Sequence, residues 1–425
     1  MASQYRAAPM QIISKPLFIY LQRPDTGEWI TVGRYQAAPQ NGAGTFKYAP
    51  SYVDAGCSWA IDPVNLPFRP GDERPAPRYR GLHDVLRDAC PDAWGQALLR
   101  REHGLPEGTP MSRYLLLANN ADRWGALAVG TRPAPSVAQL SHPSLLQLPL
   151  LAEELAAMSA QRPAVDARLR RRLVQTASVG GARPKATLRD DQGRFWLVKP
   201  RIASDIADIP CLEHAAQQWG AASGLDFATT VLHPAAAGRS AVRVLRFDRS
   251  GERRLMCVSA ASLLQAEYPD NMAHSSLWSY PRLAEELRMI GAPPEDRIEL
   301  FGRMVFNAVC GNDDDHVRNH AVTYRHEQGR WRLSPAFDVV PNPVDTPRSL
   351  SMQLSTGRFT ISRASVLADA HRFGFAESAA AEHHLDALLS RIVNGFEVAA
   401  QWLDPEWTAL LHARMEYNVR LLSSP

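Results

Sequence analysis

The chain has 425 residues, of which 45% are hydrophobic and 21% are charged. This composition is typical of folded globular proteins and excludes a disordered chain, and the length is sufficient for two or three domains. The formal net charge of +3 at pH 7 is too small to indicate a nucleic-acid-binding protein by itself. The densest basic run, RLRRRL at 168–173, is more typical of a solvated helix face.

Cysteine spacing and hydropathy both favour a protein of the cytoplasm. The five cysteines are scattered and form no C-x-x-C pair, which favours a reducing compartment over a disulfide framework. The N-terminal stretch is interrupted by Arg6 and Lys15, so it lacks the basic-then-apolar order of a signal peptide. No run of about 18 uninterrupted apolar residues occurs, so we expect no membrane span.

The first third of the chain predicts a small α+β domain. Short β-like runs, LFIYL, WITVGRY and GTFKYA, alternate with turns. Residues 80–104 then carry apolar side chains at helical spacing, with Gly104 as the stop. From Ala134 to Leu150 the chain is rich in Pro, Ser and Gln, a composition that suits a linker between domains.

Beyond the linker, strands come first and helices follow. RFWLVKP and SAVRVLRFDR read as strands, and the helix between them, CLEHAAQQWGAASGL, closes at Gly224. Helical material runs from Arg363 to Leu422. The segment LFGRMVFNAVC has one apolar helix face and ends at Gly311. We expect a hairpin of AVTYRH and GRWRLSP after it, which leads to AFDVVP.

The loop between that helix and the hairpin, GNDDDHVRNHAV, holds three consecutive aspartates. The short hairpin predicts that this loop and the one carrying Asp338 lie at the same end of the structure. Phosphoryl transfer needs such a set: Asp314 would accept the proton of the attacking hydroxyl, while Asn319 and Asp338 would hold Mg²⁺ through oxygen atoms. His316 and Arg318 would brace the loop or contact phosphate. Two other interpretations stay open, a solvated acidic turn and a carboxylate metal site for hydrolysis.

Three upstream features favour phosphoryl transfer. SVGGARPKATL, residues 178–188, is a small-residue turn whose backbone amides can cradle phosphates. Lys199 ends an apolar strand, where a charged lysine needs an anionic partner, and Glu213 in the next helix could supply it. Each feature alone has an ordinary structural explanation, as a turn, a strand end or a solvated helix residue. Their order along the chain is the order that an ATP-dependent kinase requires.

The ordered set resembles the HipA family of serine/threonine kinases, the toxins of bacterial type II toxin–antitoxin modules. The motifs that carry the resemblance span nearly the whole chain: FKYAPSYV, RGLHDVLRDACPDAWGQALLRRE, RWGALAV, SVGGARPK, FWLVKP, LEHAAQQWGAASGL, RFDR, FNAVCGNDDDHVRN and SPAFDVVP. The family's spacing of five residues between aspartate and asparagine places the catalytic aspartate on Asp314. The metal-binding aspartate falls on Asp338, with Asn319 beside it, and the autophosphorylated serine falls on Ser178. The remaining ATP-binding positions are Gly180, Gly181, Ala182, Arg183, Pro184, Lys185, Lys199, Leu245, Arg246 and Phe247.

The resemblance implies a bilobal, protein-kinase-like α+β fold with a small N-terminal domain and a mostly helical C-terminal lobe. We expect the domains at residues 1–132, the linker and connecting helix at 133–165, the nucleotide-binding lobe at 166–250 and the helical lobe at 251–425. It also implies ATP and Mg²⁺ as cofactors and a small, DNA-binding, HipB-like antitoxin as partner, through which the chain would meet operator DNA only indirectly. The implied substrate is a translation factor such as an aminoacyl-tRNA synthetase, and the outcome is growth arrest.

The chain departs from the family pattern at three places. Arg183 and Pro184 stand where glutamine and a polar residue are usual, Leu212 replaces an asparagine, and the catalytic loop is unusually acidic. No departure removes a group that the chemistry needs. A small-molecule or lipid kinase and a non-catalytic nucleotide-binding scaffold remain as alternative functions.

Overall fold

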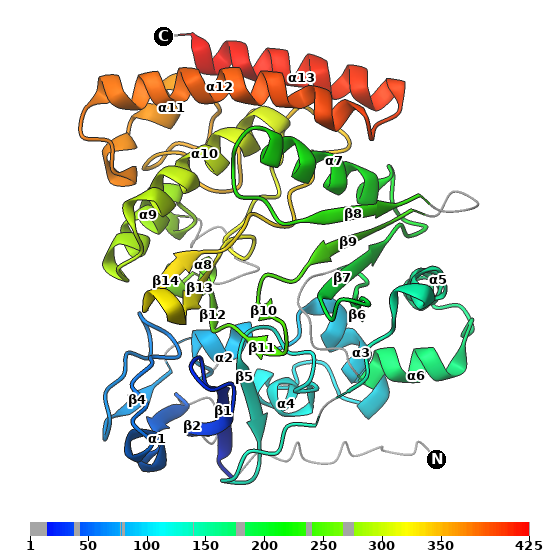
Figure 1. The fold of residues 1–425 in the computed structure, drawn as a ribbon, viewed down its shortest axis with the longest axis vertical. Helices are drawn as coiled ribbons and strands as arrows, with labels where there is room; N and C mark the ends of the chain where they lie inside the picture. The colour runs from blue at the N-terminus through cyan, green and yellow to red at the C-terminus, as the bar shows by residue number, and fades with distance from the viewer. Residues whose placement is uncertain are drawn as a thin grey trace, which may run out of the picture.

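The computed structural model describes residues 15–37, 43–76, 78, 81–138, 140–175, 183–234, 240–266 and 276–424. It has the predicted α+β architecture, with an N-terminal domain at one end of the molecule and a helical layer at the other (Figure 1). Between them lies a four-stranded sheet. We call residues 183–250 the sheet lobe and residues 251–424 the helical lobe.

The N-terminal domain is built on an antiparallel sheet in the order β4-β3-β2-β1-β5. Its strands are β1 Leu17–Gln22, β2 Trp29–Gln36, β3 Thr45–Tyr48, β4 Glu73–Pro75 and β5 Leu127–Gly130. Its helices are α1 Pro50–Asp54, α2 Asp84–Asp88, α3 Ala93–His103 and α4 Met111–Leu117. The three β-like runs of the sequence therefore form the first three strands, as predicted.

The single helix expected over residues 80–104 is wrong, because the chain forms two helices there. α2 ends at Asp88 and α3 starts at Ala93, and Pro91 stands in the break. Proline lacks the amide that would continue the helix and disfavours helical conformation in the residue before it. Gly104 does end α3, in the left-handed conformation expected of a helix stop.

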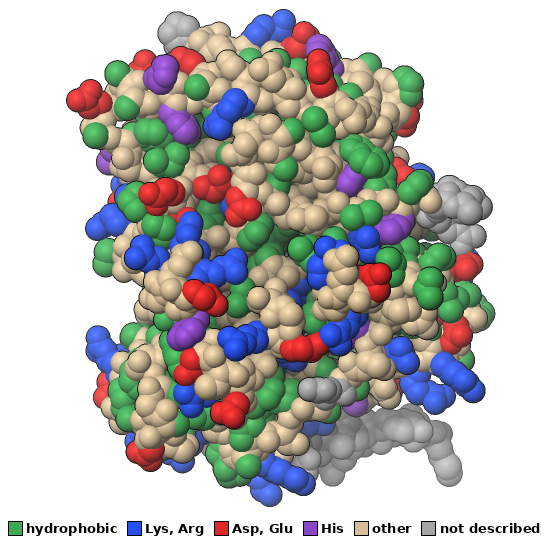
Figure 2. Space-filling model, viewed as in Figure 1, with side chains coloured by type: hydrophobic (Ala, Val, Ile, Leu, Met, Phe, Trp, Pro, Cys, Tyr) green, Lys and Arg blue, Asp and Glu red, His purple; other side chains and the backbone are tan. Residues whose placement is uncertain are grey.

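Two helices connect the N-terminal domain to the sheet lobe: α5 Leu148–Ser159, preceded by the short helix η1 Leu145–Gln147, and α6 Ala167–Gln175. α6 contains the basic run. Its Leu169 and Leu173 are buried, while Lys and Arg side chains gather on the surface over this helix (Figure 2). Arg170 forms an ion pair with the buried Glu154 of α5. The arginines of the basic run therefore lie on a helix, as expected, and the structure adds that its two leucines are buried.

The sheet lobe has the antiparallel order β6-β7-β9-β8. Its elements are β6 Ala186–Arg189, β7 Phe195–Pro200, α7 Ile209–Ala222, β8 Thr230–His233, β9 Ala241–Leu245 and β10 Arg249–Ser250. One face of β6 and β7 packs against the leucines of α5 and α6. The helix α7 covers the sheet from the side of α12, as Figure 1 shows.

The helical lobe contains a small antiparallel sheet, β12-β13-β14, and a layer of helices. The strands of this sheet are β12 Cys257–Ser259, β13 Ala321–Arg325 and β14 Arg330–Leu333, and the lobe also contains β11 Arg253–Arg254, which pairs with β10. Its helices are α8 Ala260–Leu263, α9 Tyr280–Met289, α10 Pro294–Cys310, α11 Arg363–Leu367, α12 Ser378–Ala400 and α13 Pro405–Ser423, with the short helices η3 His326–Gln328 and η4 Ala370–Phe373. The predicted hairpin is the β13–β14 pair.

The helix α10 ends where the sequence predicted, at Gly311. This residue has φ +78°, and its amide donates to the carbonyl of Asn307. Glycine adopts this left-handed conformation without steric cost, so the chain leaves the buried helix sharply and enters the acidic loop. The hydrophobic core around α10 is continuous with that of the N-terminal domain.

All five cysteines are free thiols. No helix within the described ranges is both long and apolar enough to cross a membrane.

Candidate functional site

The ammonium group of Lys199 lies at the centre of the site. Its Nζ atom is 2.6 Å from Oε1 of Glu213 on α7 and 2.6 Å from Oδ1 of Asp338 in the loop after β14. The Lys199 and Glu213 side chains are buried, with 7% and 3% of their surface exposed. Burial opposes the charged form of the lysine, but the two carboxylates outweigh it and raise the pKa of Lys199. The sequence therefore paired Lys199 with the correct glutamate, and the structure adds Asp338 as a second partner.

Asp338 is held in an unusual backbone conformation. Its φ is +60°, in the left-handed region that non-glycine residues seldom adopt. Burial favours the protonated carboxyl, yet Lys199 and then Lys185 bring its pKa well below the ordinary range, so the side chain is ionised. Its second oxygen receives no hydrogen bond from any residue in the described part of the chain. That oxygen is available to a cation.

The three consecutive aspartates of the acidic loop have different environments. Asp313 accepts two hydrogen bonds of 3.0 Å from Nδ2 of Asn342. Asp315 is 1% exposed and accepts from the hydroxyl of Tyr280, while Nε2 of His320 lies 2.9 Å from its Oδ1. Asp314 alone is exposed, and no described residue donates to its carboxylate. The two flanking carboxylates therefore anchor the loop and leave Asp314 pointing to solvent-accessible space.

Asp314 interacts electrostatically with the other candidate residues. Partial desolvation of the carboxyl raises the pKa of Asp314. The negative charges of Asp338 and Asp313 raise it further, while His316 lowers it. The pKa of His316 is lowered by burial. Nδ2 of Asn319 donates to the Asp314 carbonyl at 3.2 Å, which orients the amide. Residues 314, 316, 319 and 338 thus form one connected group, in the loop before β13 and the loop after β14.

The donor set fits a hard divalent cation such as Mg²⁺. Asp338 offers an ionised carboxylate oxygen and Asn319 an amide oxygen, and Mg²⁺ is commonly held by one or two protein oxygens together with substrate phosphates and water. No cluster of three or more His, Cys, Asp or Glu side chains suited to a metal occurs in the described ranges. The arrangement therefore matches a metal brought with a phosphate ligand better than a dedicated protein cage.

The predicted phosphate loop is described only in part. Ser178, Gly180, Gly181 and Ala182 lie outside the described residues. Arg183 forms a bidentate ion pair with Asp205, at 2.5 and 2.7 Å, and Pro184 is buried. Burial lowers the pKa of Lys185, which lies close enough to Asp338 and Lys199 for their charges to act on it. Lys185 therefore joins the central group, whereas the Arg183 guanidinium is held by the chain itself.

The predicted hinge at residues 245–247 begins at Leu245, the last residue of the inner strand β9. The Leu245 amide donates to the Thr229 carbonyl, and the Phe247 ring lies 5.1 Å from that of Phe337, next to Asp338. The guanidinium group of Arg246 is buried and bound within the chain, and the role of Arg246 in the hinge stays a prediction. Its Nη1 lies 2.6 Å from Asp122 of the N-terminal domain, and Nε and Nη2 bind Asp248. Any contact of Arg246 with a nucleotide is thus left to its backbone.

Arg318 is likewise bound within the chain. Its Nη2 lies 3.0 Å from Oδ1 of Asp92, and its Nη1 lies 3.5 Å from Oδ1 of Asp88. Of the two tasks that the sequence suggested for Arg318, these contacts correspond to bracing the loop. Sequence reasoning missed both aspartates and Asp122, since they belong to the N-terminal domain. The recurrence of acids at 84, 88 and 92 and the proline at 91 were the available signals.

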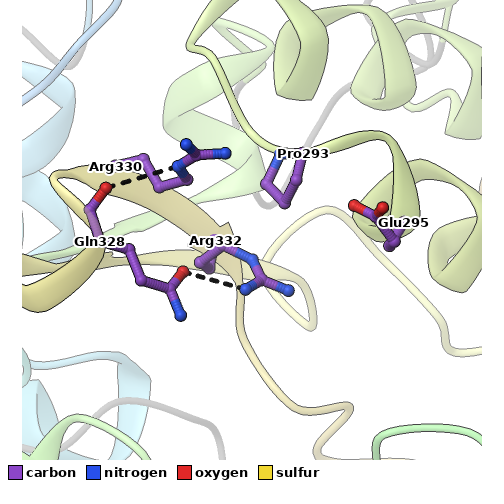
Figure 3. A pocket seen from close by; sticks show the side chains of 5 residues that line it. All are labelled: Pro293, Glu295, Gln328, Arg330 and Arg332. Carbon is purple, nitrogen blue, oxygen red and sulfur yellow. Dashed lines mark hydrogen bonds between the residues drawn. The ribbon is translucent and has the colours of Figure 1, made fainter.

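A pocket of about 430 Å³ is lined by other residues (Figure 3). Pro293 and Glu295 at the start of α10 line it, with Gln328, Arg330 and Arg332 of the β13–β14 hairpin. The Arg332 guanidinium in this pocket binds the buried Asp296 and also Gln328. None of these residues belongs to the predicted site.

Comparison with known families decides the classification. The model of the HipA-like C-terminal domain matches residues 177–398, more than half of the chain. The chain belongs to the HipA family. The matched range contains Lys199, Glu213, Asp314, Asn319 and Asp338.

Two solved structures are similar to the chain. HipA of Shewanella oneidensis MR-1, solved with HipB and its operator DNA, has a TM-score of 0.68 and 16% sequence identity, over 96% of this chain and 100% of that one. The likeness confirms the predicted HipA-like fold, with its N-terminal domain and two lobes. The proinflammatory kinase CtkA of Helicobacter pylori has a TM-score of 0.43 and 12% identity, over 56% of this chain and 90% of its own. A comparison with curated proteins finds no match.

Proposed function

We propose that this HipA-family chain is an ATP-dependent serine/threonine protein kinase. The observation that carries the proposal is the junction at Lys199, where a buried lysine of the sheet lobe binds both Glu213 and the ionised Asp338 of the helical lobe. The exposed Asp314 lies in the same group. Lysine, glutamate and metal-binding aspartate are the parts that must be in place together for a protein kinase to act.

Each residue of the site has its own role in the proposed phosphoryl transfer. Asp314, whose carboxylate receives no hydrogen bond from a described residue, accepts the proton of the incoming hydroxyl. Lys199 and Lys185 present positive charge to the phosphates, and Asn319 and Asp338 hold Mg²⁺. Bound ATP and Mg²⁺ supply the phosphoryl group and neutralise its charge. The junction of Phe247 and Phe337 provides an aromatic surface beside the hinge, where we place adenine.

We further propose that the protein acts as a toxin of a toxin–antitoxin pair. Membership of the HipA family supports this role, and the Shewanella HipA structure contains HipB and operator DNA. A small, HipB-like, DNA-binding protein is therefore the proposed partner of this chain. A translation factor such as an aminoacyl-tRNA synthetase is the proposed substrate class, and Ser178 the proposed site of autophosphorylation. A phosphate there would add about −1.5 to −2 charge beside the phosphate loop and oppose ATP binding.

The test is incubation of the purified full chain with labelled ATP and Mg²⁺, followed by mass mapping of the phosphate. The Asp314→Asn variant and a sample with excess EDTA serve as controls. We expect label on the wild type alone and on Ser or Thr residues, Ser178 among them. Binding of ATP without transfer by the wild type, to itself or to protein in a cell lysate, would contradict the proposed function.

A small-molecule kinase would give a different pattern in the same assay. It would consume ATP only when a metabolite mixture is added and would leave protein unlabelled. Asp314→Asn would abolish that ATP consumption too. The molecule that receives the phosphate, protein or metabolite, therefore distinguishes a protein kinase from a small-molecule kinase.

A further inference from the structure

The ion pair between Asp92 and Arg318 joins the N-terminal domain directly to the loop that carries Asp314. The two side chains are 17% and 12% exposed, so water screens the pair only in part. Arg318 stands four residues after Asp314 and next to Asn319. A displacement of Arg318 would therefore move the proposed base and the proposed metal ligand together.

Asp92 occupies the N-cap position of α3 but does not cap it. An aspartate at this position commonly accepts a hydrogen bond from an amide of the first helical turn. In this chain its side chain makes no such bond and instead lies 3.0 Å from Arg318 and 3.3 Å from Arg87. The break at Pro91 places this carboxylate between the two guanidinium groups.

Asp88, one turn earlier, supports the other side of the same loop. Its carboxylate accepts from the amide and hydroxyl of Ser259, at 2.8 and 2.7 Å, and from the hydroxyl of Ser262 at 2.7 Å. These serines form the start of α8, whose Ala260 and Ala261 amides donate to the carbonyls of His320 and Val317. The N-terminal domain thus holds the loop at two points.

The charge of Asp92 also acts on the phosphate side of the site. Burial opposes ionisation of Asp92, but Arg318, Arg87 and Lys185 lower its pKa. Lys185 interacts in turn with Asp338 and Lys199. One carboxylate of the N-terminal domain therefore binds the loop of the proposed base and acts through its charge on Lys185, at the end of the proposed phosphate loop.

We propose that Asp92 is a positioning residue for phosphoryl transfer, which it serves by fixing Arg318 and thereby the relative placement of Asp314 and Asn319. The inference rests on the proposed function. It makes the N-terminal domain a part of the active centre. Asp92 touches neither substrate nor metal in this scheme.

The test compares full-length variants in the ATP assay. Asp92→Asn keeps the size and the capping ability of the side chain but removes its charge. We expect turnover at saturating ATP to fall roughly tenfold or more, with KM for ATP changed less than about twofold. Arg318→Gln should also lower turnover, and the double variant should be about as active as the less active single variant, since both changes remove the contact between Asp92 and Arg318. Asp92→Glu, which restores the charge, should recover part of the turnover.

Asp25→Asn is the matched control, because Asp25 forms a comparable 2.7 Å pair with Arg23 in the same domain. It should leave turnover unchanged. Wild-type turnover in Asp92→Asn would overturn the proposal, as would losses in Asp92→Asn and Arg318→Gln that multiply in the double variant.

Amide hydrogen exchange over residues 313–320 provides a readout independent of activity. We expect faster exchange in this loop for Asp92→Asn and not for Asp25→Asn, with the rest of the helical lobe unchanged. Unchanged exchange in the loop would overturn the link. A wild-type chain without transferase activity would instead refute the proposed function, and the exchange result would still decide whether Asp92 fixes the loop.

Discussion

Lys199 and Asp338 connect the sheet lobe to the helical lobe through a contact of 2.6 Å between Nζ and Oδ1. The same ammonium group neutralises Glu213, which is buried on α7. Since neither carboxylate of this group has another cation at hydrogen-bond distance among the described residues, Lys199 supports both the fold and the proposed chemistry.

Replacing Lys199 by methionine should therefore destabilise the protein as well as inactivate it. Removal of one partner from a buried ion pair costs about 3–5 kcal/mol, because the remaining charge is left uncompensated. We expect Lys199→Met to lower the free energy of unfolding by about 3 kcal/mol in urea denaturation. Adding Glu213→Gln should return at least about 1 kcal/mol while activity stays absent. A double variant less stable than Lys199→Met would contradict this account.

The three aspartates of the loop should separate into one chemical and two structural roles. Asp314→Asn should reduce phosphoryl transfer by about 10²-fold or more without a change in the unfolding midpoint, because the carboxylate is exposed and makes no described hydrogen bond. Asp315→Asn should cost about 1–3 kcal/mol, since it disturbs the buried contacts to Tyr280 and His320. Thermal unfolding and transfer assays on both variants check this. Equal stability losses would refute the separation.

Gly311 should not tolerate a side chain. A Cβ atom there would lie 2.7 Å from Cδ of the buried Arg414 and 3.1 Å from Cδ of Pro347, in addition to the strain of a φ of +78°. Gly311→Ala should destabilise the chain by more than about 2 kcal/mol and displace the acidic loop. Gly329→Ala is the control, because φ is +62° and the space is open, so only the backbone strain of about 1 kcal/mol applies. Equal costs in urea denaturation would contradict the predicted clash.

Acid should weaken the N-terminal domain through His83. Burial lowers the pKa of His83 from 6.5 to about 4. A proton added to Nδ1 would find no hydrogen-bond acceptor among the described residues. The unfolded chain binds this proton more readily than the folded chain below pH 6.5, so stability is lost as the pH falls from about 6.5 to about 4. The loss should reach on the order of 2–3 kcal/mol. His83→Gln should remove that part of the pH dependence, as measured by urea midpoints at pH 7.5 and 4.5, and an unchanged slope would refute the assignment.

Local patterns were sufficient for the parts of the site that neighbouring residues determine. The apolar stripe before Gly311 and the β-rich runs after it predicted α10 and the β13–β14 hairpin, which place Asp314 and Asp338 at one end. The choice of Asp314 from three adjacent acids came from family spacing. In the structure, Asp314 is distinguished by its exposure, because its neighbours are bound by the nearby His320 and by Tyr280 and Asn342, which are 35 and 29 residues away from their partners.

The contacts between the N-terminal domain and the candidate site could not be predicted from local sequence patterns. Asp92 and Arg318 are separated by more than 200 residues, and Asp122 and Arg246 by more than 120. Local periodicity carries no information about pairs at such separations. The missed break at Pro91 added to the error, because a continuous helix would aim residue 92 differently. Residues 178 and 180–182 were predicted from the same motifs, and their roles stay predictions.

The buried pair of Asp122 and Arg246 limits which N-terminal domains from related proteins could replace the one in this chain. Arg246 is 6% exposed and Asp122 is 2% exposed, and together they cross from the N-terminal domain to the hinge. A chimaera that received its first 130 or so residues from a relative without this acid would leave the buried Arg246 with Asp248 alone, a carboxylate that Arg246 shares with Arg249. We therefore expect the two halves of such proteins to be inherited as a matched set, with the linker a poor crossover point despite its permissive composition.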